Sequence, residues 1–298
     1  MNSRDQGTSP SYRLWAVLLL CVALGGCSLK MTYPFMDWWL SWTIRDYISL
    51  DKTQRQQLET QLDQFHHWHQ QTQLPEYADF VGQLSLDVQQ PITAQQLTAT
   101  TTEIHQHWLN SLDYLIVDID RLFISLSDDQ WQEFLVSLAD TQAQYTDPFL
   151  SKEPHARQKL RQKRFSKGAK RWVGSLTETQ QELIKEWSLK LESIAELSLQ
   201  RQSDWSKEAT QLFLKRHQLE AEERRTELRQ LIINDSRDWS TDAQQKIAHN
   251  QELSYQLLID LHRTLTPKQH KKIQHKLKNY HADFYYLANQ VEQLALYP

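Results

Sequence analysis

Three histidines stand close together in the segment Phe65-His66-His67-Trp68-His69. On a helix His66 and His69 share one face, and His67 lies one turn after the carboxylate of Asp63. These groups could hold a divalent metal. The segment has no HExxH spacing, and a catalytic zinc site would need a further ligand that the sequence does not identify. We therefore expect histidines on a helix surface around a core Trp68, and keep all three only as weak metal candidates.

Other polar pairs lack catalytic spacing. Asp118 and Asp120 are two positions apart and point in different directions on a helix, so we expect solvated charges. His105 and His107 fail as a pair for the same reason. A Gly-rich phosphate loop, a nucleophile elbow and a kinase motif set are all absent from the sequence. The sequence predicts a protein that is not an enzyme and has no cofactor; the enzymatic alternative is a metal-dependent hydrolase using the histidine cluster.

A basic stretch runs from Lys152 to Arg171, in which nine Lys and Arg face a single acidic residue, Glu153. Such a strip could meet anionic lipid headgroups, lipopolysaccharide or an acidic envelope polymer. The simpler interpretation is the polar face of a helix whose cations favour its C-terminal end before Gly174. The candidate anion-binding residues are Arg161, Lys163, Arg164, Lys167, Lys170 and Arg171.

An aromatic cluster, Trp38, Trp39 and Trp42, lies in the segment 35–48. Tryptophan is favoured at the headgroup level of a bilayer, so these are candidate membrane-proximal residues. The alternative, which we expect, is that Phe35, Trp38 and Trp42 pack into a helical core.

The N-terminal segment has the features of a secretion signal. Arg4 and Arg13 precede a short apolar run, residues 14–24, which is about half the length that a spanning helix needs. A cysteine directly after Leu24-Gly25-Gly26 resembles a bacterial lipobox, in which the thiol of Cys27 is lipidated and the leader is cut before it. Residues 1–26 are then a signal peptide and residues 27–33 are the lipidated cysteine and a short tether.

Removal of the leader leaves 31 Lys and Arg against 36 Asp and Glu, a balance that argues against nucleic-acid binding. With Cys21 removed and Cys27 lipidated, cysteine catalysis, zinc–thiolate sites and disulfides are excluded. Only three glycines, Gly82, Gly168 and Gly174, remain, which counts against nucleotide-binding folds and β-sandwiches.

The remaining sequence predicts helices. One pattern recurs five times: an apolar residue is followed by Asp, Ser or Thr, and Gln stands three positions after that polar residue. This is the pattern of a capping box. These predicted helix starts are Leu50–Gln54, Ile92–Gln96, Leu126–Gln130, Leu176–Gln180 and Leu265–Gln269, with a further start near Ser240-Thr241. Between the starts, apolar residues recur with helical spacing.

The last helix carries a heptad seam that steps by four and three from Ile273 to Leu294. Such a seam suits an antiparallel partner helix, and it could equally form a homodimer. We expect breaks at Pro75, Pro91, Pro148 and Pro154 and near Asn234. The prediction is an all-α multi-helix bundle, with sub-bundles over residues 34–147 and 155–298 and long helices in the second.

Two resemblances follow. The chain has the early Trp38-Trp39-Leu40 cluster, His67-Trp68-His69 with Leu74–Ala78, and the basic stretch that runs into Leu176–Gln180. In these features it resembles an uncharacterised family of proteobacterial lipoproteins, a domain of unknown function. The Leu-Thr-x-x-Gln motifs at Leu176–Gln180 and Leu265–Gln269 are similar to the LTxxQ motif of periplasmic stress chaperones about half this length, which cradle unfolded clients on a helical dimer. The shared residues are also a helix cap.

Ser28 rather than Asp follows Cys27, which resembles the outer-membrane sorting rule of bacterial lipoproteins. This resemblance implies a lipoprotein with a palmitate-type anchor in the outer membrane, facing the periplasm. We expect a non-catalytic binding or assembly role, with an envelope protein or anionic polymer as partner. The alternative from a different class is a chaperone-like binder of unfolded envelope proteins.

Overall fold

The computed structural model describes residues 29–150, 153–234 and 239–295, so the predicted leader and Cys27 lie outside the described residues. The described part consists of helices and connecting turns and contains no strand, which confirms the predicted all-α class. None of its helices combines the length and the hydropathy that crossing a membrane requires.

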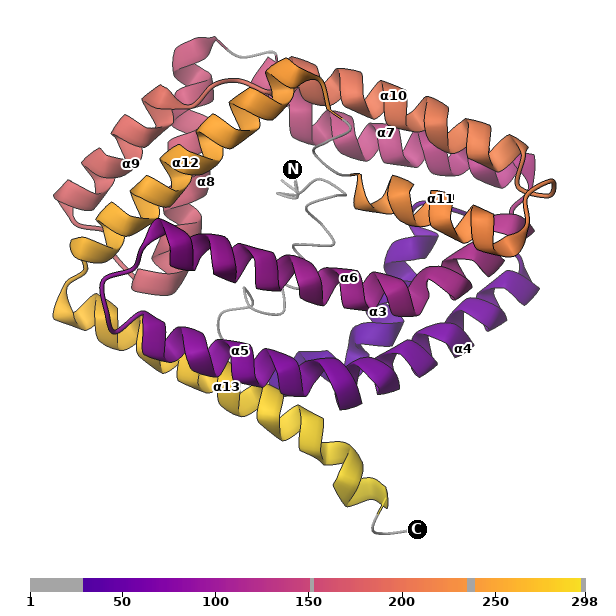
Figure 1. Cartoon of the computed structure of the whole chain (residues 1–298), viewed down its shortest axis with the longest axis horizontal. Helices are drawn as coiled ribbons and strands as arrows, with labels where there is room; N and C mark the ends of the chain where they lie inside the picture. The colour runs from indigo at the N-terminus through magenta and orange to yellow at the C-terminus, as the bar shows by residue number, and fades with distance from the viewer. Residues whose placement is uncertain (1–28, 151–152, 235–238, 296–298) are drawn as a thin grey trace, which may run out of the picture.

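The N-terminal helices are α2 (Leu29–Thr32), the 3-10 turn η1 (Tyr33–Phe35), α3 (Met36–Arg45), α4 (Lys52–Trp68), η2 (His69–Gln73), α5 (Leu74–Asp87), α6 (Ala94–Ser125) and α7 (Asp128–Leu150). The C-terminal helices are α8 (Pro154–Val173), α9 (Glu178–Lys190), α10 (Ala195–Leu214), α11 (Ala221–Ile233), α12 (Thr241–Arg263) and α13 (Pro267–Ala295). Figure 1 shows α8, α9 and α12 on one side, α7, α10 and α11 on the other, and α5 beside α13 along the lower edge.

Two of the predicted breaks are wrong. The chain does not break at Pro75: α4 continues through η2, a five-residue π-helix, into α5, with the proline in the first turn of α5. Because proline lacks an N–H and its ring clashes with the preceding turn, the chain widens there instead of stopping. Helix α7 likewise runs through Pro148 to Leu150. The break at Pro154 is confirmed, since this proline begins α8.

Two large cores hold the described helices together. In the first core, α2, η1, η2 and α5 pack on α13 through Leu74, Tyr77, Phe284 and Leu287. Helix α5 thus packs against the heptad seam of α13 along Leu277–Leu287. This is the antiparallel partner helix that the seam predicted. The second core joins α4, α6 and α7 to α10 and α11 around Phe213, and a smaller third core joins α9 and α12. Both large cores combine helices from before and after the predicted sub-bundle boundary, which itself stays a prediction.

All five predicted capping boxes form. Four of their glutamines do more, because they pair two by two across the fold. Gln54 and Gln130 form one pair, which we call the first amide junction, and Gln180 and Gln269 form the second amide junction. The first joins the starts of α4 and α7, and the second joins the starts of α9 and α13.

The two amide junctions share one design. In each, both side-chain amides donate to the other's Oε1, at 3.1 and 2.7 Å in the first junction and 2.9 and 2.9 Å in the second. Each Nε2 also donates to a backbone carbonyl two residues before the partner's cap residue; these carbonyls belong to Ser125, Ser49, Thr264 and Ser175. Capping chemistry therefore also connects helices that are distant in sequence.

Candidate functional site

The basic stretch forms part of a larger cationic surface. Helix α8 has no buried residue, and in the described structure it lies against the first half of α13. The segments 154–173 and 267–282 carry eight and five Lys and Arg and no Asp or Glu, in a chain whose formal net charge is −4. Arg171 of α8 lies beside Lys272 and Lys276 of α13. We call these three cations, together with three exposed lysines of α8, the basic face: Lys163, Lys167, Lys170, Arg171, Lys272 and Lys276.

Helical spacing positions these side chains. Steps of four place Lys163, Lys167 and Arg171 on one side of α8, and the same step places Lys272 and Lys276 on one side of α13. The half-buried Trp172 of α8 packs against the first core and holds the two helices in register. A rigid cluster of cations results from two segments about 100 residues apart in the chain.

Lys276 reports the electrostatics of this contact. Its Nζ lies 4.8 Å from the centre of the Trp172 ring and donates to the backbone oxygen of Arg171 at 3.3 Å. Burial lowers the pKa of Lys276, and the nearby charges of Lys272 and Arg171 lower it further. The contribution of two neighbouring cations to this lowered pKa indicates a positive potential at Lys276, which would favour an incoming anion.

The structure divides the six predicted anion-binding residues. Arg161 donates to the backbone oxygen of Leu191 at 3.0 Å, which satisfies a carbonyl at the end of α9, and the guanidinium of Arg164 lies 4.7 Å from the ring of Phe149. These two therefore have packing roles. Lys163, Lys167, Lys170 and Arg171 are exposed. Sequence reasoning missed Lys272 and Lys276, and the available signal was the run of five lysines without an acid in residues 267–282.

A shallow pocket borders the basic face. It is lined by Lys170, Gly174, Ser175, Leu176 and Gln181, where α8 turns into α9. Gly174 has a φ of 84°, a conformation that other residues rarely adopt, and a Cβ there would lie 3.3 Å from the Nζ of Lys272. Glycine thus lets the backbone approach the cations closely.

The three predicted metal candidates are not brought together as a site. His69 is buried, with its Nδ1 3.0 Å from the hydroxyl of Tyr33 and its Nε2 3.3 Å from the hydroxyl of Tyr77. Burial lowers the pKa of His69 to about 3. In the described part of the chain, no three His, Cys, Asp or Glu side chains form a group suited to a metal. The expectation of surface histidines is therefore wrong for His69, which belongs to the first core.

The aromatic cluster lies largely outside the core. Phe35, Trp38 and Trp42 are exposed, so the expectation that these three pack inside is wrong. Trp39 is half-buried. From residues 35–48, Met36 and Ile48 are buried in the two large cores, and Leu40 and Ile44 pack against these cores. Apolar residues occupy both faces of this helical segment, and helical spacing alone does not identify which face the core covers.

Asp120, expected to be solvated, is instead buried in an ion pair. Its Oδ2 accepts from Arg224 Nη2 at 2.9 Å and from Arg225 Nε at 3.3 Å. Arg224 also donates to the backbone oxygens of Arg216 and Leu219. Arg224 is buried as well, and this network joins α6 to α11.

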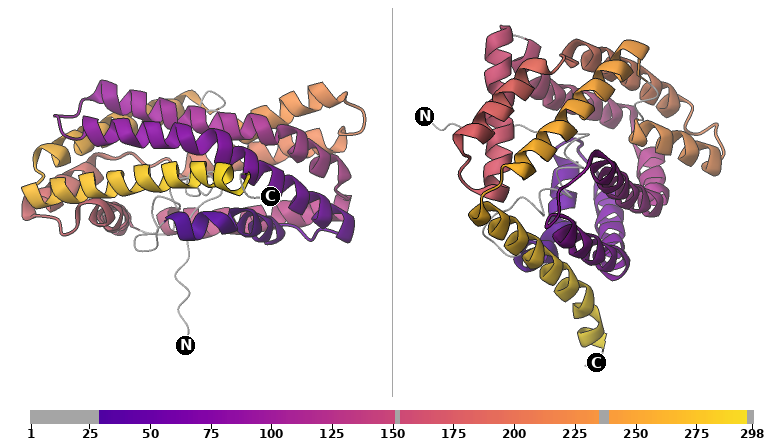
Figure 2. Two further views of the ribbon diagram at one scale, coloured as in Figure 1. Left: turned by 90° about the horizontal axis from the view of Figure 1, so that it is seen from below. Right: turned by 60° about the vertical axis from the view of Figure 1, so that its left-hand side comes forward.

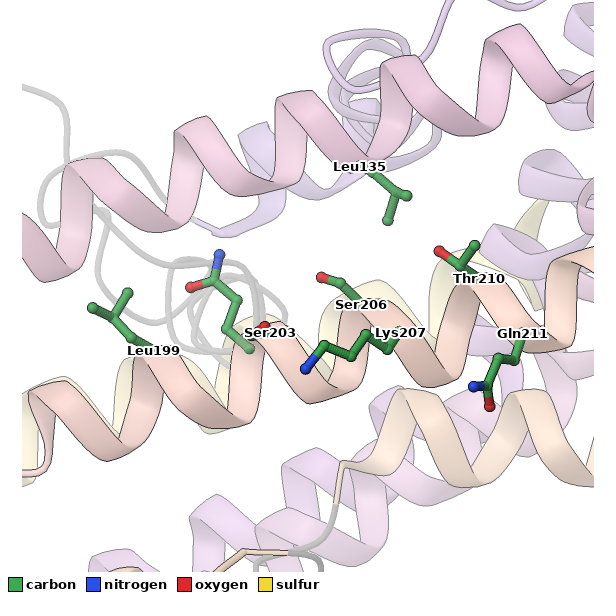
Figure 3. Close-up of a pocket in the computed structure, with 8 residues that line it drawn as sticks. Leu135, Leu199, Ser203, Ser206, Lys207, Thr210 and Gln211 are labelled. Carbon is green, nitrogen blue, oxygen red and sulfur yellow. The ribbon is translucent and has the colours of Figure 1, made fainter.

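A second groove lies between α7 and α10. Figure 3 shows Leu135 of α7 facing Ser206 and Thr210 of α10, with Lys207 nearby. Lys207 pairs with Asp204 at 3.1 Å, and Thr210 accepts from the indole of Trp131 at 3.4 Å. This groove is open and carries little charge, so the basic face remains the stronger candidate for a binding surface.

Comparison with known proteins gives one match. Residues 46–244 match a family described as a family of unknown function, DUF6279. This range contains α8 and the first member of the second amide junction, and it ends before α13. No curated protein and no solved structure matches the chain.

Proposed function

The chain belongs to the DUF6279 family, whose function is unknown. We propose that it is a lipid-anchored, non-catalytic binding protein of the bacterial envelope. We propose further that it binds a phosphate-bearing polyanion through its basic face. The observation that carries the proposal is the charge segregation: thirteen Lys and Arg and no acid in 154–173 and 267–282, within a chain of net charge −4. A surface of one sign on an acidic protein is suited to electrostatic recognition.

The chemistry of the cations favours phosphate groups. Lysine ammonium groups act as point charges for phosphate, and the planar guanidinium of Arg171 can donate two parallel hydrogen bonds to it. The face extends along two helices, so it suits a ligand with several phosphates better than a single small anion. Lys276 is held with a lowered pKa beside Lys272 and Arg171, and a bound anion would relieve that repulsion.

The location in the envelope rests on the N-terminal sequence. A short apolar run and a cysteine after Leu24-Gly25-Gly26 support lipidation of Cys27, and Ser28 supports outer-membrane sorting. Leu29, the first described residue, is only two positions after Cys27, so the body would lie close to the lipid. A periplasmic-facing position would expose the basic face to phosphorylated glycolipids and polymers.

Binding of deacylated lipopolysaccharide, a soluble and phosphorylated probe, tests the proposal. The mature lipoprotein in phosphatidylcholine nanodiscs would be titrated by calorimetry. We expect Lys163→Glu with Lys167→Glu to weaken binding at least tenfold, and added salt to weaken the wild type. The matched control is Lys52→Glu with Arg55→Glu on α4, which has the same change in net charge on exposed residues. Equal losses in both variants, or no binding by the wild type, would contradict the proposal.

The chaperone-like alternative is favoured by one observation. The two LTxxQ-like motifs, 176–180 and 265–269, meet in the second amide junction and form a single structural unit. This supports a shared helix-capping design with the stress chaperones, whose clients are unfolded proteins. Suppression of aggregation of a reduced, unfolded test protein by the mature lipoprotein would support this alternative, and a flat result beside polyanion binding would favour the primary proposal.

A further inference from the structure

An exposed apolar strip runs along α2, η1 and α3. Met31, Phe35, Trp38 and Trp42 follow one another in steps of four, three and four, and are 67, 63, 61 and 48 % exposed. Isolated exposed apolar residues are common, but four large ones on one continuous face are typical of an interaction surface. We call these four residues the apolar strip.

The apolar strip is rigidly attached to the body. On the opposite side of the same segment, Leu29, Tyr33 and Met36 are buried in the first core. The backbone N–H of Leu29 donates to Asp283 of α13 at 3.0 Å, and the ammonium of Lys30 lies 3.4 Å from the same carboxylate. The short α2 is therefore fixed to α13, and the strip has one orientation relative to the rest of the molecule.

The position of the strip in the chain indicates what covers it. Met31 is four residues after Cys27, so even a fully extended chain puts at most about 14 Å between them. With Cys27 lipidated, the Met31 end of the strip cannot lie farther than this from the bilayer surface. Figure 2 shows α3 on the outside of the flattened molecule, in the lower layer of the left view, where a planar surface could reach it.

We propose that the apolar strip docks into the headgroup region of the bilayer that holds the lipid anchor. Tryptophan is the side chain best suited to this depth, because its ring is apolar and its N–H can remain hydrated. The four side chains would enter the interface on one side of a helix, as an interfacial amphipathic helix does. The inference rests on the anchor of the proposed function but not on the basic face.

Docking would fix how the molecule stands on the membrane. A single lipid-linked tether leaves a protein free to tumble at the surface, whereas four inserted side chains on a rigid helix add a second attachment with one orientation. Because α2 is fixed to α13 through Asp283, the same attachment would also fix the orientation of the basic face relative to the bilayer.

Spin-label depth measurements test the proposal. Phe35→Cys and Trp42→Cys would be made separately in the full chain, and the mature lipoprotein purified, labelled with a nitroxide and reconstituted in phosphatidylcholine vesicles. The neutral lipid removes any contribution of the basic face. The matched controls are Val136→Cys on α7 and Leu189→Cys on α9, which are 60 and 62 % exposed apolar positions on other helices.

We expect collisions with oxygen to exceed those with a water-soluble nickel chelate at positions 35 and 42, and the reverse at 136 and 189. Stronger nickel collisions at 35 and 42 would overturn the proposal, because the strip would then face water. Few collisions with either agent would also overturn the proposal, because another part of a protein would then cover the strip. Dipolar broadening of the nitroxide spectrum would identify a second copy of the chain as that cover. A protein mass that includes the uncut leader would identify residues 14–24 of the same chain as the cover.

The mass of the Cys27 peptide separates the two proposals. An unmodified Cys27 would overturn the docking proposal together with the anchor. A lipidated Cys27 with a water-exposed strip would overturn docking alone, and neither result depends on polyanion binding by the basic face.

Discussion

The two large cores bury polar groups in opposite ways. In the first core, His69 lies between the hydroxyls of Tyr33 and Tyr77, and burial keeps its imidazole neutral. In the second core, the carboxylate of Asp120 and the guanidinium of Arg224 are both buried and paired. One core therefore contains a titratable group held without charge, and the other contains two charges that compensate one another.

The two cores are therefore vulnerable to different changes. A neutral buried histidine is stable as long as it stays unprotonated, so the first core is sensitive to acid. A buried ion pair gains little over an apolar pair, but removing one partner leaves the other charge uncompensated. The second core is therefore sensitive to single substitutions. Mutation and pH can be used to separate the two.

The largest effect is expected from Asp120→Ala. It would leave the guanidinium of Arg224 buried without its carboxylate, so we expect the free energy of unfolding to fall by about 3–5 kcal/mol. Urea unfolding followed by circular dichroism measures this loss. The matched control is Asp118→Ala on the same helix, whose carboxylate pairs only with the exposed Arg121 among the described contacts. Its loss should stay below about 1 kcal/mol; equal losses would mean that Asp120 acts through helix stability alone.

Acid should weaken the first core next. Unfolded His69 takes up a proton near pH 6.5, whereas native His69 does so only near its pKa of about 3. Between these values the unfolded state binds more protons, so stability falls as pH falls, by about 3 kcal/mol between pH 7 and pH 4. Burial lowers the pKa of His66 and of His107 as well, which adds to the same slope.

The measurement is the free energy of unfolding between pH 7 and pH 4 for the wild type and for His69→Leu. The variant should start less stable, because two hydroxyls lose a partner, but its stability should change less steeply with pH. An unchanged slope would show that His69 is not the group that couples this core to acid.

The glutamine side chains of the amide junctions are a third kind of buried polar group, because they are neither charged nor titratable. Gln180 and Gln269 are both buried in the second amide junction, where each makes hydrogen bonds to the other and to a backbone carbonyl. Gln180→Ala would remove a cap bond and leave buried partners unpaired, so we expect a loss of about 2 kcal/mol. This loss should not vary between pH 7 and pH 4, unlike the acid-sensitive first core. Thermal unfolding at both pH values measures it, and a pH-dependent loss would contradict the interpretation.

Sequence reasoning predicted the helices but not what joins them. The spacing of cap residues and of the α13 seam is local, so the helix starts at Asp51 and Thr177 and the apolar face of α13 could be read directly. The pairing of Asp120 with Arg224 spans 104 positions, and periodicity within one helix carries no information about such a partner.

The candidate site was predicted in part for the same reason. The α8 half of the basic face is a contiguous run of cations, which the sequence shows directly, whereas Lys272 and Lys276 join it only because α13 folds back beside α8. The prediction placed the apolar strip on the wrong side because this segment carries apolar side chains on both of its faces. Spacing within one helix does not say which of two apolar faces the rest of the chain will cover.

The smallest effect is expected at the one predicted capping box outside the amide junctions. Gln96 accepts from the backbone and the hydroxyl of Thr93, and in the described contacts its side chain makes no bond to another helix. Gln96→Ala should therefore lose only the cap, about 0.5 kcal/mol, because water can replace the exposed hydrogen bonds. Gln54→Ala removes the same kind of cap together with the bonds of the first amide junction, so it should cost about 1 kcal/mol or more beyond that. Comparing the two by urea unfolding isolates the contribution of the cross-helix amide pair, and equal losses would show that all five glutamines act only as caps.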